Sequence, residues 1–390
     1  MLKAVSAVQE IEELARELGF DLFGVAPLRP PRDADRFLRW IAEGRHAGME
    51  YLRQDAARIV DPAQILPAGR SILVLGLGHS RPQVELAGGI RLARYAAGRD
   101  YHNVLTKRLR RLLRRLKRTH GLGEARTIAD SGPLLERSHA AEAGLGHASK
   151  AANLLHPALG PWFFLGEVLV DLDLEPTYRD PGVSCGSCTA CIDTCPTGAI
   201  LAPGLVDARS CISYHTIENP GRIPVEIRSR LGGWVFGCDV CSEVCPWGRK
   251  APDRSDRFGT HGLVEQGPLG WLSETRGFEE RSEGSALRRA GRTGLARNAA
   301  LVLGTQPVAG AEGVLLASLH QDPSAVVREA AGWALSVRFG ESAGVRAALE
   351  RASQADPDAE NRAYLRLWRE RCGGTTSLAA PVEVPQQKPS

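Results

Sequence analysis

The sequence is organised around one stretch, Cys185-Gly-Ser-Cys188-Thr-Ala-Cys191-Ile-Asp-Thr-Cys195-Pro196. Its cysteines follow the spacing C-x2-C-x2-C-x3-C-P. This spacing is typical of segments that bind a cubane [4Fe–4S] cluster through thiolates. The stretch therefore predicts iron–sulfur chemistry near the middle of the chain.

A second run of cysteines completes the pattern. It reads Cys238-x2-Cys241-x3-Cys245-Pro246, and Cys211 lies between the two runs. Each cluster needs four thiolates, and in two-cluster ferredoxins the fourth cysteine of a run ligates the other cluster. This crossover predicts one cluster on Cys185, Cys188, Cys191 and Cys245. It predicts the second cluster on Cys195, Cys211, Cys238 and Cys241.

Two structural zinc sites, each with four thiolates, are the alternative. Zinc ligands usually come as two well-separated C-x2–4-C pairs. Closely spaced cysteines in two runs, each with a trailing proline, fit clusters better. The ninth cysteine, Cys372, stands alone near the C-terminus, and we assign it no role.

The composition is that of an ordinary globular protein. The 390 residues are 43% hydrophobic and 24% charged, with a formal net charge of +4. No apolar run reaches the roughly 18 residues of a membrane helix, and the N-terminal segment has no signal-peptide core. We therefore expect a cytoplasmic protein without a membrane partner, in which clustered cysteines serve metal or redox chemistry. Because the net charge is small, any nucleic-acid surface must be local.

Strands alternate with helices before the cysteines. Apolar periodicity predicts helices over 8–18, 34–43, 91–116 and 133–144, and strands over 20–26, 70–76, 127–130 and 162–170. The alternation predicts an α/β domain over residues 1–178, with helices covering a sheet. It contains no G-x-G-x-x-G motif and no P-loop, so the acceptor of the cluster electrons must be sought elsewhere.

One predicted helix is strongly basic. Residues Thr106–His120 read TKRLRRLLRRLKRTH, in which Leu109, Leu112, Leu113 and Leu116 form an apolar stripe. Lysines and arginines cover the rest of the helix. Clustered basic side chains bind nucleic-acid phosphates by releasing counterions. A helix face that is merely solvated is the alternative, and the sequence leaves both open.

The pattern becomes helical after the cysteines. Residues 295–303 resemble 326–334, and Asp356-Pro357 repeats Asp322-Pro323. These repeats predict an all-α, HEAT-like domain over 280–372, which would serve as a binding platform. The cysteine runs form a ferredoxin-like domain over 179–252. The tail, 373–390, is rich in Pro, Ser and Gln and predicts disorder.

Several motifs give the chain a resemblance to the epoxyqueuosine reductase family. They include Asp130-Ser-Gly-Pro133-Leu-Leu-Glu136-Arg137 and Phe164-Leu-Gly166-Glu167. Others lie at 46–52, 58–62, 93–102, 143–146, 211–218 and 237–247. This family comprises cobalamin-dependent iron–sulfur enzymes that convert epoxyqueuosine to queuosine at the wobble position of tRNA. The resemblance makes 1–178 a cobalamin-binding domain.

The resemblance also implies roles for residues. Asp130 would be the proton donor, although an Asp before a helix can simply be an N-cap. An acid that works near neutral pH needs a raised pKa, which burial beside a corrin ring would supply. The implied cobalamin contacts are Arg58, Asp130, Leu154, Leu165, Ser213, Cys238 and Asp239. The resemblance implies no histidine ligand to cobalt, although His102, His139 and His147 have the chemistry for it.

Two segments depart from the family pattern. Gly146-His147-Ala-Ser149-Lys150-Ala151 stands where Gly-Trp-Ile-Gly-Lys-Asn is usual, and Pro246-Trp247-Gly248 stands where Pro-Trp-Asn is frequent. Lys150 is retained. The contacts made by the altered side chains are left open by the sequence.

The predicted reaction begins with an external low-potential electron donor. Electrons pass through both clusters to cobalamin, which reduces the epoxide in tRNA while Asp130 protonates the departing oxygen. A cobalamin-dependent reductive dehalogenase and a non-enzymatic two-cluster electron carrier are the alternatives. The basic helix and the repeats weigh against the dehalogenase, and bound corrinoid would exclude the carrier. We expect the protein to be a monomer.

Overall fold

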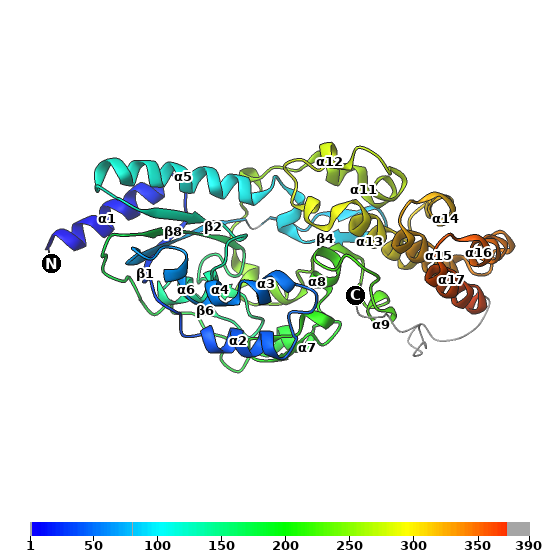
Figure 1. Ribbon diagram of the computed structural model, residues 1–390, viewed down its shortest axis with the longest axis horizontal. Coiled ribbons are helices and arrows are strands. Elements are labelled where there is room, and N and C mark those ends of the chain that lie inside the picture. Colours follow the sequence, from blue (N-terminus) through cyan, green and yellow to red (C-terminus); the bar gives the residue numbers. More distant parts are fainter. Residues whose placement is uncertain (1, 80, 373–390) are drawn as a thin grey trace. The chain divides into compact units, whose positions relative to one another are not determined.

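The computed structural model describes residues 2–79 and 81–372, with side chains from residue 7 onward (Figure 1). By packing, the chain forms two compact units that do not follow sequence order. Unit 1 comprises the residues up to Pro82, Arg99–Arg209 and Asp239–Gly259. Unit 2 comprises Gln83–Gly98, Ser210–Cys238 and the residues from Thr260 onward. The predicted disordered tail lies outside the described residues.

Unit 1 contains a four-stranded sheet and the helices around it. The four-stranded sheet is formed by β1 (Leu22–Pro27), β2 (Ser71–Gly78), β5 (Ala125–Ile128) and β8 (Phe163–Val170). Two further pairs of short strands are β6 (His147–Ala148) with β7 (Leu154–Leu155), and β9 (Ile200–Ala202) with β10 (Leu205–Val206). The helices of unit 1 are α1 (Leu2–Glu17), α2 (Ala34–Ala42), α3 (Glu50–Gln54), α4 (Ala56–Val60), α5 (Tyr101–Thr119), α6 (Glu136–Glu142), α7 (Ala190–Asp193) and α10 (Val240–Glu243).

The main sheet has the strand order β1-β2-β8-β5. Every neighbouring pair is antiparallel, and Ile128 of β5 lies opposite Glu167 of β8. Helices cover the sheet, as predicted. The antiparallel direction is not what an alternation of strands and helices usually produces.

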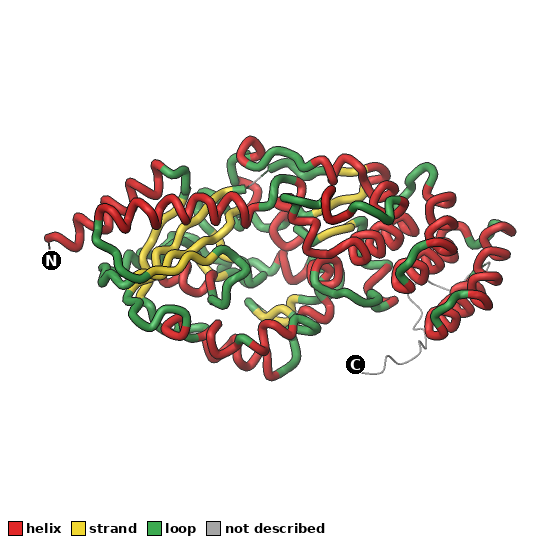
Figure 2. Tube along the Cα trace, turned by 45° about the horizontal axis from the view of Figure 1, so that its top comes forward, coloured by secondary structure: helices red, strands yellow, loops and turns green. Residues whose placement is uncertain are grey.

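The two faces of the sheet are packed by different helices. Side chains alternate along a strand, so Leu73, Leu75 and Leu77 of β2 pack with α1 and α5. Ile72 and Val74 point the other way and pack with α6. Figures 1 and 2 show the long helix α5 running beside the strands. Three layers result, with a separate apolar core on each face of the sheet.

The predicted long helix over 91–116 is wrong at its start. Residues Ile90–Leu92 form strand β4 and Arg94–Ala97 form a 3-10 turn, both in unit 2. Gly98 is extended, and the carboxylate of Asp100 accepts the His102 N–H at 2.9 Å as the N-cap of α5. An Asp N-cap satisfies N–H groups that lack helical partners, so the helix begins only at Tyr101. From there the leucine stripe is buried as predicted, apart from Leu113, which is only partly buried.

Unit 2 combines a small sheet with a helical region. Its strands are β3 (Glu85–Leu86), β4 and β11 (Trp234–Phe236), in the order β11-β4-β3. Its helices are α8 (Ile212–Ile217), α9 (Val225–Arg228), α11 (Gly262–Ser273), α12 (Phe278–Arg281), α13 (Gly291–Thr305), α14 (Ala311–Gln321), α15 (Ala325–Phe339), α16 (Ala343–Ala355) and α17 (Ala359–Arg371). The C-terminal region is therefore helical, as predicted.

The C-terminal helices pack in a regular row. Helix α13 packs against α15, and α15 packs against α17. The guanidinium group of Arg328 donates to the carbonyl oxygen of Asp322 at 2.8 Å, and Arg362 donates to that of Asp356 in the same way at 2.6 Å. The two sequence repeats thus make matching contacts. Among the described residues, no helix has both the length and the apolar character needed to cross a bilayer.

Candidate functional site

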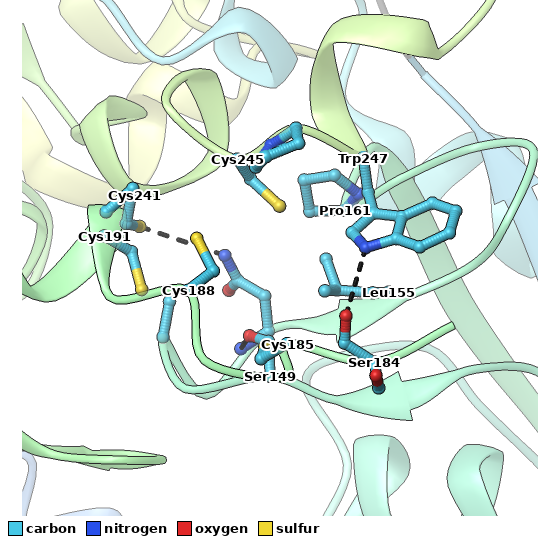
Figure 3. A pocket seen from close by; sticks show the side chains of 14 residues that line it. Ser149, Leu155, Pro161, Ser184, Cys185, Cys188, Cys191, Cys241, Cys245 and Trp247 are labelled. Carbon is cyan, nitrogen blue, oxygen red and sulfur yellow. Dashed lines mark hydrogen bonds between the residues drawn. The ribbon is translucent and has the colours of Figure 1, made fainter. Parts of the chain in front are cut away.

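The four cysteines of the first predicted cluster lie together in unit 1. Cys185, Cys188, Cys191 and Cys245 line one cavity of about 60 Å³, together with Cys241 (Figure 3). The first cysteine run turns tightly, because the Cys188 N–H donates to the Cys185 carbonyl oxygen at 2.9 Å. Helices α7 and α10, which carry Cys191 and Cys241, pack against each other. Local spacing and one tertiary contact therefore gather the thiols.

This donor set fits an iron–sulfur cluster. A [4Fe–4S] cluster requires four thiolate ligands, and the cavity offers the four predicted thiols together with that of Cys241. No group of His, Cys, Asp or Glu side chains in the described part of the chain is arranged to hold a single metal ion. The thiols instead surround a space. A space between the thiols suits a multi-iron cluster, which lies between its four ligands.

Lys150 supports the first cysteine run. Its ammonium group donates to the carbonyl oxygens of Gly186 at 2.8 Å and Cys188 at 3.0 Å. Its backbone N–H donates to the Cys185 sulfur at 3.4 Å. Hydrogen bonds and charge near the sulfurs tune iron–sulfur clusters. These contacts explain why a lysine at position 150 suits the segment next to the cysteines.

Lys150→Met is expected to weaken iron binding at this cluster by about 10-fold, because residues that support metal ligands typically contribute that much. The measurement is the rate of iron release to a chelator under anaerobic conditions. Lys117→Met, which removes a lysine from α5, serves as the control. Equal release from both variants would show that Lys150 does not support the cluster.

The other departure from the family pattern also fits the cavity wall. The Trp247 indole N–H donates to the Ser184 carbonyl oxygen at 3.2 Å (Figure 3). The Trp162 indole N–H donates to the Gly248 carbonyl oxygen at 2.9 Å. A Cβ atom at position 248 would collide with the Ser242 carbonyl oxygen. Glycine is therefore the residue that this backbone accommodates.

The cysteines predicted for the second cluster are divided between the units. Cys195 and Cys241 belong to unit 1, and Cys211 and Cys238 belong to unit 2. Within unit 1, the Ala199 N–H donates to the Cys195 sulfur at 3.3 Å. This ligand set remains a prediction.

Asp130 occupies a tight turn after β5. Its φ is +56°, a left-handed conformation that is uncommon for residues other than glycine. Its Oδ2 accepts the Tyr101 hydroxyl at 2.5 Å and lies 3.1 Å from Nε2 of His102. Helix α6 begins only at Glu136 and has no side-chain cap. The N-cap interpretation of Asp130 is therefore wrong.

The charge state of Asp130 differs from the expectation. Burial alone would raise its pKa, but hydrogen bonds from His102 and Tyr101 outweigh burial and lower the pKa. Burial would lower the pKa of His102, but hydrogen bonds to Asp100 and Asp130 raise it to about 9. At neutral pH the proton therefore resides on His102. The expected raised pKa of Asp130 is not found in the protein without a corrin.

Some residues of this site carried no assigned role in the sequence. Tyr101 and His102 are brought to Asp130 because α5 packs along β8 and β5, and the ring of Tyr101 stacks on Phe164 of β8 at 4.0 Å. Glu136 accepts a hydrogen bond from the Asp130 backbone N–H, and Glu167 is buried in the neighbouring core. The available signal was Glu167, a charged residue inside the apolar strand Phe163–Val170.

A basic hollow adjoins this site along α5. It has a volume of about 460 Å³ and is lined by His102, Asn103, Thr106, Lys107, Arg110, Arg111 and Arg114. The other basic residues of the helix include Arg108, which donates to the Gly19 carbonyl oxygen, and Arg115, which forms an ion pair with Glu17 at 2.8 Å. Some basic residues of α5 therefore line the hollow, while Arg108 and Arg115 contact other parts of unit 1. His102 belongs both to the hollow and to the Asp130 site.

The predicted cobalamin contacts fall in both units. Ser213 and Cys238 belong to unit 2, and the others belong to unit 1. Leu154 is buried, and Leu165 is partly buried in the same apolar core. Arg58 is 52% exposed and pairs with Asp55 at 3.6 Å. The contacts of these residues with cobalamin remain a prediction.

Comparison with known families first defines the class. Residues 184–248 match the profile of a 4Fe-4S double cluster binding domain, and residues 60–131 match the profile described as Epoxyqueuosine reductase QueG, DUF1730. The fold and the cysteine site therefore define an iron–sulfur protein with two clusters.

Relatives of nearly full length define the family. The epoxyqueuosine reductase of Xanthomonas campestris is 40% identical over 85% of this chain and 96% of its own. That of Pseudomonas aeruginosa is 37% identical over 86% and 95%, respectively. The chain belongs to the epoxyqueuosine reductase family and is an oxidoreductase.

Solved structures agree with this assignment. An epoxyqueuosine reductase in complex with an epoxyqueuosine-modified tRNA-Tyr stem loop has a TM-score of 0.83 and 28% identity, and covers 95% of this chain and 100% of its own. The Bacillus subtilis enzyme, with its catalytic aspartate loop swung out of the active site, has a TM-score of 0.81 and 28% identity. It covers 94% of this chain and 99% of its own.

Proposed function

We propose that this protein reduces epoxyqueuosine to queuosine at the wobble position of tRNA, in the cytoplasm. The observation that carries the proposal is the placement of Asp130. Its carboxylate shares a hydrogen bond with His102, and His102 lines the basic hollow on α5. A proton donor therefore lies beside a surface suited to RNA. The family relationship favours this function over the dehalogenase and carrier alternatives.

The cysteine sets and the family relationship support the proposed cofactors. Cys185, Cys188, Cys191 and Cys245 would hold one [4Fe–4S] cluster, and Cys195, Cys211, Cys238 and Cys241 the other. The double-cluster profile over 184–248 supports both. Cobalamin would be held by Arg58, Asp130, Leu154, Leu165, Ser213, Cys238 and Asp239. When bound, cobalamin supplies the reducing electrons for the epoxide.

Asp130 and His102 would act together as the acid. Removing the epoxide oxygen as water requires protons, and Asp130 Oδ2 would pass one to the departing oxygen. His102 carries a proton at neutral pH, because its pKa is about 9, and lies within hydrogen-bonding distance of the same oxygen. His102 would therefore supply the proton that Asp130 passes to the departing oxygen. Asp100 holds the far side of the ring, with Oδ1 2.7 Å from Nδ1.

The basic hollow would bind the tRNA backbone. Replacing Arg110 and Arg114 with Gln is expected to weaken tRNA binding about equally for all sequences, because phosphate contacts carry no base information. A plot of log binding constant against log salt concentration should flatten by roughly one unit for each phosphate that the variant no longer binds. Salt-dependent filter binding would measure this change.

The control for this test lies on the same helix. Arg115→Gln with Lys117→Gln removes the same charge from residues that do not line the hollow. The control should bind tRNA more tightly than the Arg110/Arg114 variant and retain more of the salt slope. Identical slopes for the two variants would show that the hollow does not bind phosphates and that this helix face is merely solvated.

The C-terminal helices would form HEAT-like repeats. The matching contacts of Arg328 and Arg362 support this assignment, as does the alternate packing of α13, α15 and α17. We further propose the sequence-defined domains 1–178, 179–252 and 280–372, a monomeric protein, and an external low-potential electron donor. The repeats would provide a platform for macromolecular contact.

Conversion of epoxyqueuosine in tRNA by the anaerobically purified protein tests the function. Iron, sulfide and cobalt are measured first, with and without added cobalamin. Queuosine in the digested tRNA is the product to be detected. Absence of queuosine from protein loaded with both clusters and cobalamin, in the presence of a low-potential donor, would exclude this function.

A further inference from the structure

Glu167 is an unusual residue for its position. It lies on β8, on the face that carries Phe163, Leu165 and Leu169 into the core beneath α6. Its side chain has 0% exposure. Neither carboxylate oxygen has a donor among the described residues. A lone buried carboxylate without donors is costly, so a charged Glu167 does not fit this environment.

The neighbour of Glu167 is a second carboxyl group. Glu136, in the first turn of α6, lies close enough to Glu167 for each carboxyl group to shift the pKa of the other. Two carboxyl groups can form a hydrogen bond only when one of them holds a proton. Two adjacent buried carboxylates repel each other and therefore retain a proton between them. The burial of Glu167 and the proximity of Glu136 thus favour a protonated pair.

The charges around the pair act in the same direction. Burial, together with the negative charge of Asp130, raises the pKa of Glu136 to about 7. Burial and the charge of Glu136 raise the pKa of Glu167 well above its usual range. Arg137 is the nearby cation and only partly opposes these effects. The pair therefore retains a proton to a higher pH than an ordinary carboxyl group does.

Glu136 also holds the Asp130 turn. Its Oε1 accepts the backbone N–H of Asp130 at 2.7 Å. The turn needs such support, because Asp130 has a φ of +56°, and strained backbone persists only where surrounding contacts hold it. The turn is also tight: a Cβ atom at Gly132 would meet the Ile128 side chain at 2.5 Å. One hydrogen bond thus connects the buried pair to the loop that carries Asp130.

We propose that Glu136 and Glu167 form a proton-sharing latch that holds the Asp130 turn in its working position. Glu136 is the positioning residue, because it bonds the Asp130 backbone. Glu167 fixes the Glu136 carboxyl through the shared proton. The inference rests on the proposed function only in naming Asp130 as the acid, because the latch itself is defined by contacts within unit 1.

Hydrogen–deuterium exchange of the cluster-loaded protein tests the latch without substrate. Glu136→Ala is expected to speed exchange in peptides covering Ala129–Leu134 by about 10-fold or more, since a hydrogen bond to a charged group contributes that much. Glu136→Gln keeps an oxygen for the Asp130 N–H and should restore protection. Unchanged exchange in Glu136→Ala would overturn the latch.

Glu142→Ala is the matched control. Glu142 lies on the same helix, and its Oε1 also accepts a backbone N–H, that of Arg32 at 2.9 Å. This variant should leave exchange over Ala129–Leu134 unchanged. If it speeds exchange there as much as Glu136→Ala does, the effect belongs to α6 as a whole and the assignment to Glu136 is refuted.

Infrared spectroscopy tests the shared proton. At pH 8 the wild-type protein should show the C=O stretch of a protonated carboxyl, and Glu167→Gln should lack it. An identical band in both proteins would overturn proton sharing. These readouts separate the latch from the proposed function: normal turnover by Asp130→Asn would remove the acid, while faster exchange in Glu136→Ala would still establish the latch.

Discussion

Cys188→Ala is expected to remove one cluster, with roughly four of eight iron atoms, and to leave the other. The physical reason is that each cluster needs four thiolates, and Cys188 lines the cavity formed with Cys185, Cys191 and Cys245. Cys241→Ala should remove the second cluster instead. Because the proposed electron path uses both clusters, each variant should lose turnover almost completely.

Iron analysis and electron paramagnetic resonance of the reduced proteins would measure these losses. The two variants should retain different signals. Cys372→Ala is the control, since Cys372 follows α17 and lies far from both cysteine runs in the sequence, and this variant should keep full iron content. If Cys188→Ala and Cys241→Ala lose the same signal, the crossover assignment is wrong. Zinc in place of iron in anaerobically prepared wild type would refute the cluster interpretation altogether.

Asp130→Asn is expected to lower turnover of epoxyqueuosine tRNA by about 10²- to 10⁴-fold, the usual contribution of a positioned general acid. Asn is nearly isosteric, keeps an oxygen that can accept the Tyr101 hydroxyl, and cannot donate a carboxyl proton. Cluster content should not change, because the thiolates lie elsewhere in the chain. Single-turnover conversion of the modified tRNA measures the effect.

The pH dependence of turnover gives a second readout. Because the pKa of His102 is raised to about 9, its proton is present below that pH and is lost as pH rises through it. Wild-type turnover should therefore fall above about pH 9.

Asp171→Asn is the control for Asp130→Asn. The Asp171 carboxylate accepts the Glu124 N–H at 2.9 Å, and its replacement should leave the rate near wild type. Near-wild-type turnover by cluster-loaded Asp130→Asn would remove Asp130 from the mechanism.

Local sequence patterns predicted most of the helices and strands. They failed where one predicted helix proved to contain a strand and a turn before the helix begins. The strand Phe163–Val170 and the leucine stripe of α5 follow directly from apolar spacing. The predicted helix over 91–116 failed at its start because Gly98 and the Asp100 N-cap divide the segment. Ile90–Leu92 instead pairs with Trp234–Phe236, a partner that no local pattern indicates.

The sequence by itself determined the cluster chemistry, because the spacing of Cys185, Cys188 and Cys191 within one short loop already specifies a thiolate set. Through the motif that contains it, the sequence also identified Asp130 as the candidate proton donor at the end of a strand, whereas the turn with a φ of +56° came from the structure. Only the tertiary structure decided what surrounds that carboxylate. Tyr101 and His102 reach Asp130 through the packing of α5 on the sheet, and Glu167 reaches Glu136 across the core between β8 and α6. Proton affinity depends on burial and on neighbouring charges, and residues far apart in sequence become neighbours only when strands pair and helices pack.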